Sequence, residues 1–322
     1  MLGKNINMNK LLFIGNTRLG DAVMSTGLLN DLANYYNAKA TIVCGKVAAP
    51  LFEDCPFVED IIKISKKKYS LHWVDIWKKI RLNKWDIICD LRSTPVIWFV
   101  KAKKRIVLRS SGDKIHRIKR LAKLNPSGKM PIPKIWISKE TLSDAKKYLN
   151  NYPGPYISIG PTANWAAKVW PTDNFVSLIN RILNIKELRD SKVILVGGPG
   201  EEIIGEELCK KLTDIELINL IGIPILPTAA IFSLSKIFIG NDSGLMHLSA
   251  ATGIPTLGLF GPTDDKLYSP TGKNALFIRT PKSPQELMDI PNFNHKTSPS
   301  LMGTLTVDMV ENRVKDLLRR IK

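Results

Sequence analysis

Short apolar runs rich in β-branched residues recur along this chain, and stretches with helical spacing separate them. Strands that alternate with helices indicate parallel sheets joined by crossover connections. The segment 22–36 has its leucines where a helix packs on a sheet. In the first half the apolar runs are 11–15, 40–45, 86–91 and 105–109.

The second half repeats this alternation after a break rich in Pro and Gly at 151–155. Its apolar runs are 156–160, 192–198, 215–222, 237–242, 256–261 and 275–280. The sequence therefore predicts an α/β chain of two Rossmann-like parallel-sheet domains facing a cleft. We expect an N-terminal domain at 1–151, a C-terminal domain at 152–305 and an amphipathic helix at 306–322.

Open α/β sheets bind ligands beyond the carboxyl ends of their strands, so the turns after strands are the candidate sites. The first such turn lies in "IGNTRLGDAV", residues 14–23. Its glycines have the spacing of a phosphate-binding loop, but Asp21 and Ala22 stand where Lys and Ser or Thr are needed. Two interpretations remain open: Asp21 is a catalytic carboxylate, or it is the N-cap of a helix that begins near Ala22.

The stretch at 237–263 places a buried strand, a Gly-Asn-Asp-Ser-Gly turn and a helix of small residues in direct succession. Asp242 or Ser243 can cap this helix, and Gly244 allows close approach of a ligand to the backbone. The first N–H groups and the helix dipole then favour a phosphate. His247 follows in the first turn, where it serves either as a buried structural residue or as part of the anion site. A second glycine turn, 261–263, comes after the next strand.

Two further turns contain charged residues. Lys168 lies in "PTANWAAKVWP", residues 161–171, ahead of a helix that Pro171 opens, and it is either a phosphate ligand or a surface lysine. Glu201 follows the glycines of the segment 196–202, where a carboxylate could bind ribose hydroxyls. The G-x-G-x-x-G fingerprint of dinucleotide-binding proteins is missing from the sequence.

Positive charge is concentrated in the first half. The window 63–123 has 19 Lys and Arg and four Asp, which is +15 of the formal net charge of +18. Such asymmetry indicates an anionic partner, either nucleic acid, an acidic membrane surface or a phosphorylated substrate, or else a solvated lysine-rich surface. Within the window, Trp73, Trp77 and Ile80 share one helical face, which either packs on the sheet or attaches to a bilayer.

The cysteine pattern and the short apolar stretches argue against several classes of protein. Four scattered cysteines without a C-x-x-C pair indicate neither a zinc cluster nor a disulfide framework. The sequence has no run of the roughly 18–20 apolar residues that a membrane-spanning helix needs. The polar start is followed by an apolar stretch too short for a signal peptide. We therefore expect a cytoplasmic protein.

Three segments together resemble the ADP-heptose:lipopolysaccharide heptosyltransferase family of bacterial glycosyltransferases. They are "GNTRLGDAVMSTGLL", "AAKVWP" and "GNDSGLMHLSAATGIPTLGLFGPT", in the family's order and over nearly the whole chain. The resemblance implies a glycosyltransferase fold of the B type, a nucleotide-sugar donor on the C-terminal domain and an acceptor on the N-terminal domain. It also implies inversion at the anomeric carbon, no metal and no cofactor.

The resemblance also assigns residues. The expected catalytic residues are Asp21, as the base, and Lys168, which contacts the donor diphosphate. Expected acceptor-binding residues are Arg18 and Gly20. The expected donor-binding residues are Lys168, Glu201, Asp242, Ser243, Gly244 and His247.

The expected partners are ADP-heptose, a lipid-linked lipopolysaccharide core acceptor and the anionic cytoplasmic face of the inner membrane, which the basic window contacts. Two alternatives remain. A nucleotide-sugar epimerase of related fold would act on the donor alone and would need no basic acceptor face. A basic nucleic-acid-binding protein would use the window for phosphates, but it would leave the turn at 240–244 unexplained, so we expect no nucleic acid.

Overall fold

The computed structural model describes residues 8–65, 67–109, 112, 114–150, 152–291, 293–294 and 297–321. The chain divides into two compact units, Met1–Trp136 and Ile137–Lys322. This division lies before the predicted boundary at 151/152, because α4 (Lys139–Tyr148) packs against α7 (Ile225–Leu234) of the second unit.

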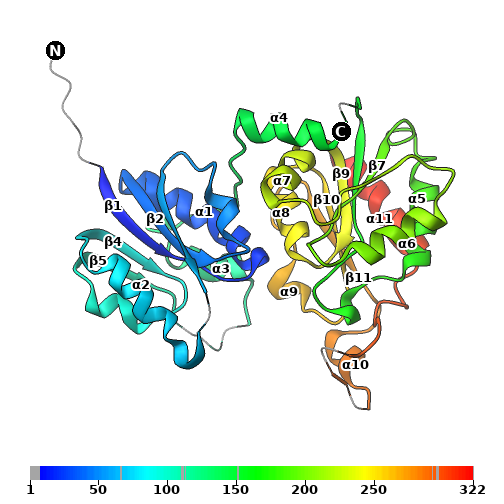
Figure 1. Ribbon diagram of the computed structural model, residues 1–322. Coiled ribbons are helices and arrows are strands. Elements are labelled where there is room, and N and C mark those ends of the chain that lie inside the picture. The colour runs from blue at the N-terminus through cyan, green and yellow to red at the C-terminus, as the bar shows by residue number, and fades with distance from the viewer. Residues whose placement is uncertain are drawn as a thin grey trace. The chain divides into compact units, whose positions relative to one another are not determined.

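The first unit is a five-stranded parallel sheet in the order β3-β2-β1-β4-β5. Its strands are β1 Asn9–Ile14, β2 Ala38–Gly45, β3 Val58–Ile64, β4 Trp85–Asp90 and β5 Ala102–Val107. Its helices are α1 Leu19–Tyr35, η1 Ala49–Phe52, η2 Lys68–Ser70, α2 His72–Ile80, η3 Pro95–Phe99 and α3 Arg117–Ala122. Helices α1 and α3 lie on one face of the sheet and α2 on the other (Figure 1). The four predicted strands are present, and the edge strand β3 was not predicted.

The second unit is a six-stranded parallel sheet in the order β11-β10-β9-β6-β7-β8. Its strands are β6 Tyr156–Gly160, β7 Lys192–Leu195, β8 Leu217–Asn219, β9 Ser235–Asn241, β10 Thr256–Phe260 and β11 Ala275–Arg279. Its remaining helices are η4 Ala166–Lys168, α5 Thr172–Ile182, α6 Glu202–Lys211, α8 Gly244–Thr252, α9 Asp265–Tyr268, α10 Pro284–Met288 and α11 Val307–Arg320. Helices α4, α7 and α8 lie on one side of this sheet and α5, α6 and α11 on the other (Figure 1).

The predicted C-terminal helix is present as α11, and it is part of the second unit. Its apolar face buries Val310, Val314 and Leu317 completely, in the same core as β6, β9 and α5. Burial of a face of this kind supplies most of the stability of a surface helix. The segment 306–322, which we expected as a separate helix, therefore packs on the sheet of the second unit as its last helix.

Both sheets have a point where the chain reverses its direction of winding, between β1 and β4 in the first and between β6 and β9 in the second. Open α/β sheets bind their ligands at this place. In the second sheet, Gly160 pairs with Gly240. A Cβ atom on either glycine would lie 2.7 Å from the ring of Phe238, so only glycine fits at these two positions.

Candidate functional site

The loop 161–171 is held firmly at the carboxyl end of β6. Asn241, the last residue of β9, donates from its side chain to the carbonyl of Pro161 at 2.8 Å and accepts from the backbone N–H of Trp170 at 3.1 Å. The Trp170 side chain is fully buried and donates to the carbonyl of Leu305. These contacts explain the tryptophan of the "AAKVWP" segment and fix the loop that contains Lys168.

Lys168 forms an ion pair with Asp242 across the winding reversal. Its Nζ lies 2.8 Å from Asp242 Oδ2, and the two side chains are 17% and 7% exposed. The ammonium group also lies 5.8 Å from the centre of the Trp165 ring. Lys168 is therefore no surface lysine, and its charge acts in a site where water screens it weakly.

Helix α8 begins directly after this ion pair. Ser243 occupies the N-cap position, but its side chain makes no capping hydrogen bond, and the carboxylate of Asp242 is directed to Lys168. The expectation that either side chain caps the helix is therefore wrong. The first N–H groups of any helix lack intrahelical partners and attract anions. His247, in the first turn, is buried.

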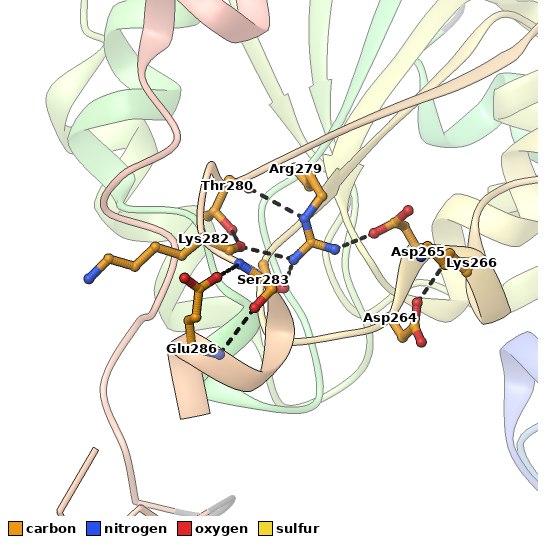
Figure 2. Close-up of polar contacts among 9 residues, drawn as sticks. Asp264, Asp265, Lys266, Arg279, Thr280, Lys282, Ser283 and Glu286 are labelled. Atoms are coloured by element: carbon orange, nitrogen blue, oxygen red, sulfur yellow. Dashed lines mark hydrogen bonds and ion pairs between the residues drawn. The ribbon is translucent and has the colours of Figure 1, made fainter. Parts of the chain in front are cut away.

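A second turn, Gly261–Thr263, follows β10, and Arg279 at the end of β11 contacts it. Figure 2 shows Arg279 with its partners Asp265 and Lys282. The Arg279 guanidinium donates to the carbonyls of Gly261 and Lys282, both at 3.1 Å, and pairs with Asp265. Because β10 adjoins β9, this turn lies beside the start of α8. Arg279 therefore links β11 to the turn beside the start of α8.

Glu201 makes a local contact. Its Oε2 accepts from the backbone N–H of Gly198 at 2.7 Å, and the residue itself occupies the N-cap position of α6. A similar bond from Gly200 lowers the pKa of Glu202. One oxygen of Glu201 is thus engaged in its own turn, and a ribose contact would use the other oxygen.

In the first unit, Asp21 is in the first turn of α1, whose N-cap residue is Arg18. The alternative that Asp21 is the N-cap does not hold, because the helix starts earlier than predicted. Among the residues described, the Asp21 carboxylate has no hydrogen bond or ion pair. The turn itself is tightly packed: a Cβ on Gly45 would lie 2.6 Å from the Thr17 backbone.

The predicted residues thus lie in two groups, one in each unit, and each group is at the carboxyl ends of the strands of its sheet. Lys168, Asp242, Ser243, Gly244 and His247 lie around the ends of β6 and β9, and Arg18, Gly20 and Asp21 follow β1. Asn241 was not predicted, although it lies within the quoted "GNDSG" turn. Its two backbone contacts, rather than any charge, make it important.

A hollow of about 490 Å³ lies along the same loop, which is within the size range of small-molecule sites. Its walls are formed by Ala163, Asn164, Trp165, Ala166, Val169, Trp170, Pro171, Thr172, Ile204 and Ser300. Across the described ranges, no cluster of three or more His, Cys, Asp or Glu is placed to hold a metal ion. No helix in those ranges is long and apolar enough to span a bilayer.

Comparison with known proteins gives a consistent picture. Residues 114–297, more than half of the chain, match glycosyltransferase family 9 (heptosyltransferase). Lipopolysaccharide heptosyltransferase 3 of Escherichia coli is 23% identical over 80% of this chain and 85% of its own length. Lipooligosaccharide heptosyltransferase 2 of Campylobacter jejuni is 25% identical, over 93% and 97%.

Solved structures share the fold. The E. coli ADP-heptose lps heptosyltransferase II superposes with a TM-score of 0.74 at 20% identity, over 97% of this chain and 99% of that one. A glycosyltransferase family 9 protein from Veillonella parvula gives a TM-score of 0.77 at 18% identity, over 97% of both chains. The predicted two-domain α/β architecture of the glycosyltransferase B type is thereby confirmed.

Proposed function

Because this chain belongs to glycosyltransferase family 9, the heptosyltransferase family, we propose that it transfers a heptose-type sugar from ADP-heptose to the inner core of lipopolysaccharide. The chain covers most of the length of relatives named lipopolysaccharide heptosyltransferase 3 and lipooligosaccharide heptosyltransferase 2. The observation that carries the proposal is the buried Lys168–Asp242 pair beside the start of α8, because it holds an ammonium group next to the first N–H groups of that helix, which together can bind a nucleotide diphosphate.

The proposed reaction is a single displacement with inversion. The acceptor hydroxyl oxygen bonds to the anomeric carbon while the bond from that carbon to the diphosphate oxygen breaks. ADP leaves with the electron pair, and Asp21 takes the hydroxyl proton. The carboxylate suits this role because none of the described side chains or backbone groups occupies its oxygens.

Charge that develops on the departing diphosphate needs stabilisation, which Lys168 and the first N–H groups of α8 supply in this proposal. Asp242 orients the ammonium group, so Lys168 loses little conformational freedom when the donor binds. Ser243, Gly244 and His247 complete the donor turn, and Glu201 binds the ribose with its second oxygen. No metal is required by this scheme.

The basic window is proposed to contact the anionic membrane surface that holds the acceptor; its Lys66 and Asp113 lie outside the described residues. The face of Trp73, Trp77 and Ile80 packs on the core of the first unit, so it does not provide the contact. Trp98 and Phe99 of η3 do so instead, since they are 64% and 73% exposed. Exposed aromatic residues among basic ones are typical of surfaces that bind at a bilayer interface.

The direct test is product analysis. The purified protein is incubated with ADP-heptose and a deacylated core oligosaccharide that lacks the added heptose. We expect an oligosaccharide one heptose heavier and an equal amount of ADP, both measured by mass spectrometry. Parallel reactions with UDP- and GDP-sugars test the nucleotide. Conversion of the donor without acceptor would instead indicate an epimerase, and no transfer from any donor would overturn the proposal.

A further inference from the structure

An arginine lies at the winding reversal of the first sheet, in the loop directly after β4. We propose that Arg92 binds an oxyanion of the acceptor, a carboxylate or a phosphate, and so orients the acceptor hydroxyl toward Asp21. The inference rests on the proposed function, and it adds a residue that none of the sequence motifs contains.

The acidic neighbour of Arg92 is fully used by the backbone. Asp90, the last residue of β4, is completely buried. Its Oδ1 accepts from the backbone N–H of Arg92 at 2.8 Å, and its Oδ2 accepts from the N–H and the hydroxyl of Thr94 at 2.6 and 2.7 Å. Asp90 therefore shapes the turn and makes no hydrogen bond to the guanidinium group.

The guanidinium group itself is partly withdrawn from water. Its carbon lies 5.1 Å from the centre of the Trp73 ring, and its Nη1 is buried without a hydrogen-bond partner among the described residues. This burial lowers the pKa of Arg92, while the charge of Asp90 opposes that change. Burial of one unpaired donor makes the cation unfavourable unless an anion offsets its charge. The Nε and Nη2 atoms are outside the buried, unpartnered set and have no hydrogen bond within the described residues, and a planar guanidinium fits an oxyanion best.

The turn holds a strained conformation that directs this side chain. Ser93 has a φ of 53°, in the left-handed region that side chains disfavour, and its hydroxyl donates to the carbonyl of Leu108 at 2.5 Å. Strain of this kind persists where the surroundings impose it, and it clusters at binding sites. The Asp90 and Ser93 contacts together hold Arg92 at the edge of the sheet.

An anion bound at Arg92 would lie close to the turn that follows the neighbouring strand, β1. β1 pairs with β4, and the backbone N–H of Leu91 bonds to the carbonyl of Ile14, so the turns that contain Asp21 and Arg92 leave adjacent strands at the same edge. Opposite charges at that edge discriminate between the two ends of an acidic sugar. The anionic group is drawn to Arg92, and Asp21 repels it and receives the hydroxyl.

The test uses Arg92→Ala and Arg92→Lys with Arg320→Ala as the control, in a membrane-free assay with deacylated core oligosaccharide. Arg320 is exposed at the end of α11 in the second unit, outside the basic window. We expect Arg92→Ala to raise the acceptor KM about 10- to 100-fold, as loss of a charge-assisted bond does. The acceptor KM of Arg92→Lys should lie between those of wild type and Arg92→Ala. The Kd for ADP-heptose should be unchanged in both variants, and the control variant should keep the wild-type acceptor KM.

A structural role would give a different result. Because Arg92→Ala removes a buried unpaired donor, we expect its Tm to stay level or rise. Phosphatase-treated and carboxyl-reduced oligosaccharides identify the anion, since the Arg92→Ala effect disappears with the form that lacks it. An unchanged acceptor KM, or a lower Tm with a parallel loss of donor affinity, would overturn the inference. If the wild type transfers no sugar, the proposed function fails, and calorimetric binding of the same oligosaccharides still decides the role of Arg92.

Discussion

Lys168 Nζ lies 2.8 Å from Asp242 Oδ2, and this ion pair joins the loop after β6 to the turn after β9. Both side chains are largely buried, so each needs the other to offset the loss of hydration. The pair thus has two roles in our account. It stabilises the winding reversal of the second sheet, and it holds an ammonium group where the proposed donor places its diphosphate.

These two roles can be separated by mutation. Lys168→Ala leaves the Asp242 carboxylate buried and unpaired, and we expect it to lower the free energy of unfolding by about 3 kcal/mol, the lower end of the range for a broken buried pair. The double variant Lys168→Met with Asp242→Asn removes both charges, so its stability should largely return. Turnover should remain about 10²–10³-fold below wild type in both variants.

Urea unfolding and steady-state kinetics measure the two effects. Recovery of turnover together with stability in the double variant would show that Lys168 acts only through the fold. Wild-type stability of Lys168→Ala would show that the ion pair contributes little.

Membrane contact predicts a salt-dependent association. Vesicles of phosphatidylglycerol should retain the protein at low salt and release it as the salt concentration rises, because exposed charges are screened over roughly 8–10 Å near physiological ionic strength. Replacing Trp98 and Phe99 by Ser should weaken vesicle binding relative to wild type at the same salt concentration. Ile203→Ser is the control, since Ile203 is 77% exposed on the second unit, outside the basic window. Binding is measured by co-sedimentation with the vesicles. Equal binding to neutral vesicles, or unchanged binding after both replacements, would contradict membrane contact through this surface.

Cysteine chemistry tests the packing of the first unit. Burial raises the pKa of Cys44 and Cys55 to about 12, and Cys89 is also buried. The thiolate is the reactive form, so these thiols should resist iodoacetamide at pH 8. Cys209 on α6 is partly exposed and should be alkylated first, faster as the pH rises toward its raised pKa. Peptide mapping that finds Cys44 or Cys55 modified as fast as Cys209 in the folded protein would contradict the burial of these two thiols in the first unit.

The sequence predicts the fold well because buried parallel strands are continuous apolar runs. It does not predict β3, whose segment VEDIIKI mixes charged residues with apolar ones, as edge strands often do. The domain boundary also differs, since the Pro-rich break at 151–155 follows α4, and the packing of α4 on α7 is not visible in the sequence.

The donor turn is recognisable from local motifs, but the contacts that organise it are long-range. Lys168 and Asp242 are 74 residues apart, and only the order of β6 and β9 in the sheet brings them together. For the same reason, Arg92 has no signal in the sequence. It becomes significant through the buried Asp90, the Trp73 ring and its position beside the turn of Asp21.

The catalytic role of Asp21 is the central claim, and Asp21→Asn tests it most directly. Asparagine keeps the size of the side chain and lacks its basicity, and the N-cap role that Asn could also fill belongs to Arg18. ADP-heptose affinity is measured by calorimetry and turnover by ADP release, on variant and wild type with matching melting curves. We expect an unchanged donor Kd and a turnover about 10²–10⁴-fold lower, the contribution of a general base. A folded Asp21→Asn variant with wild-type turnover would contradict the account.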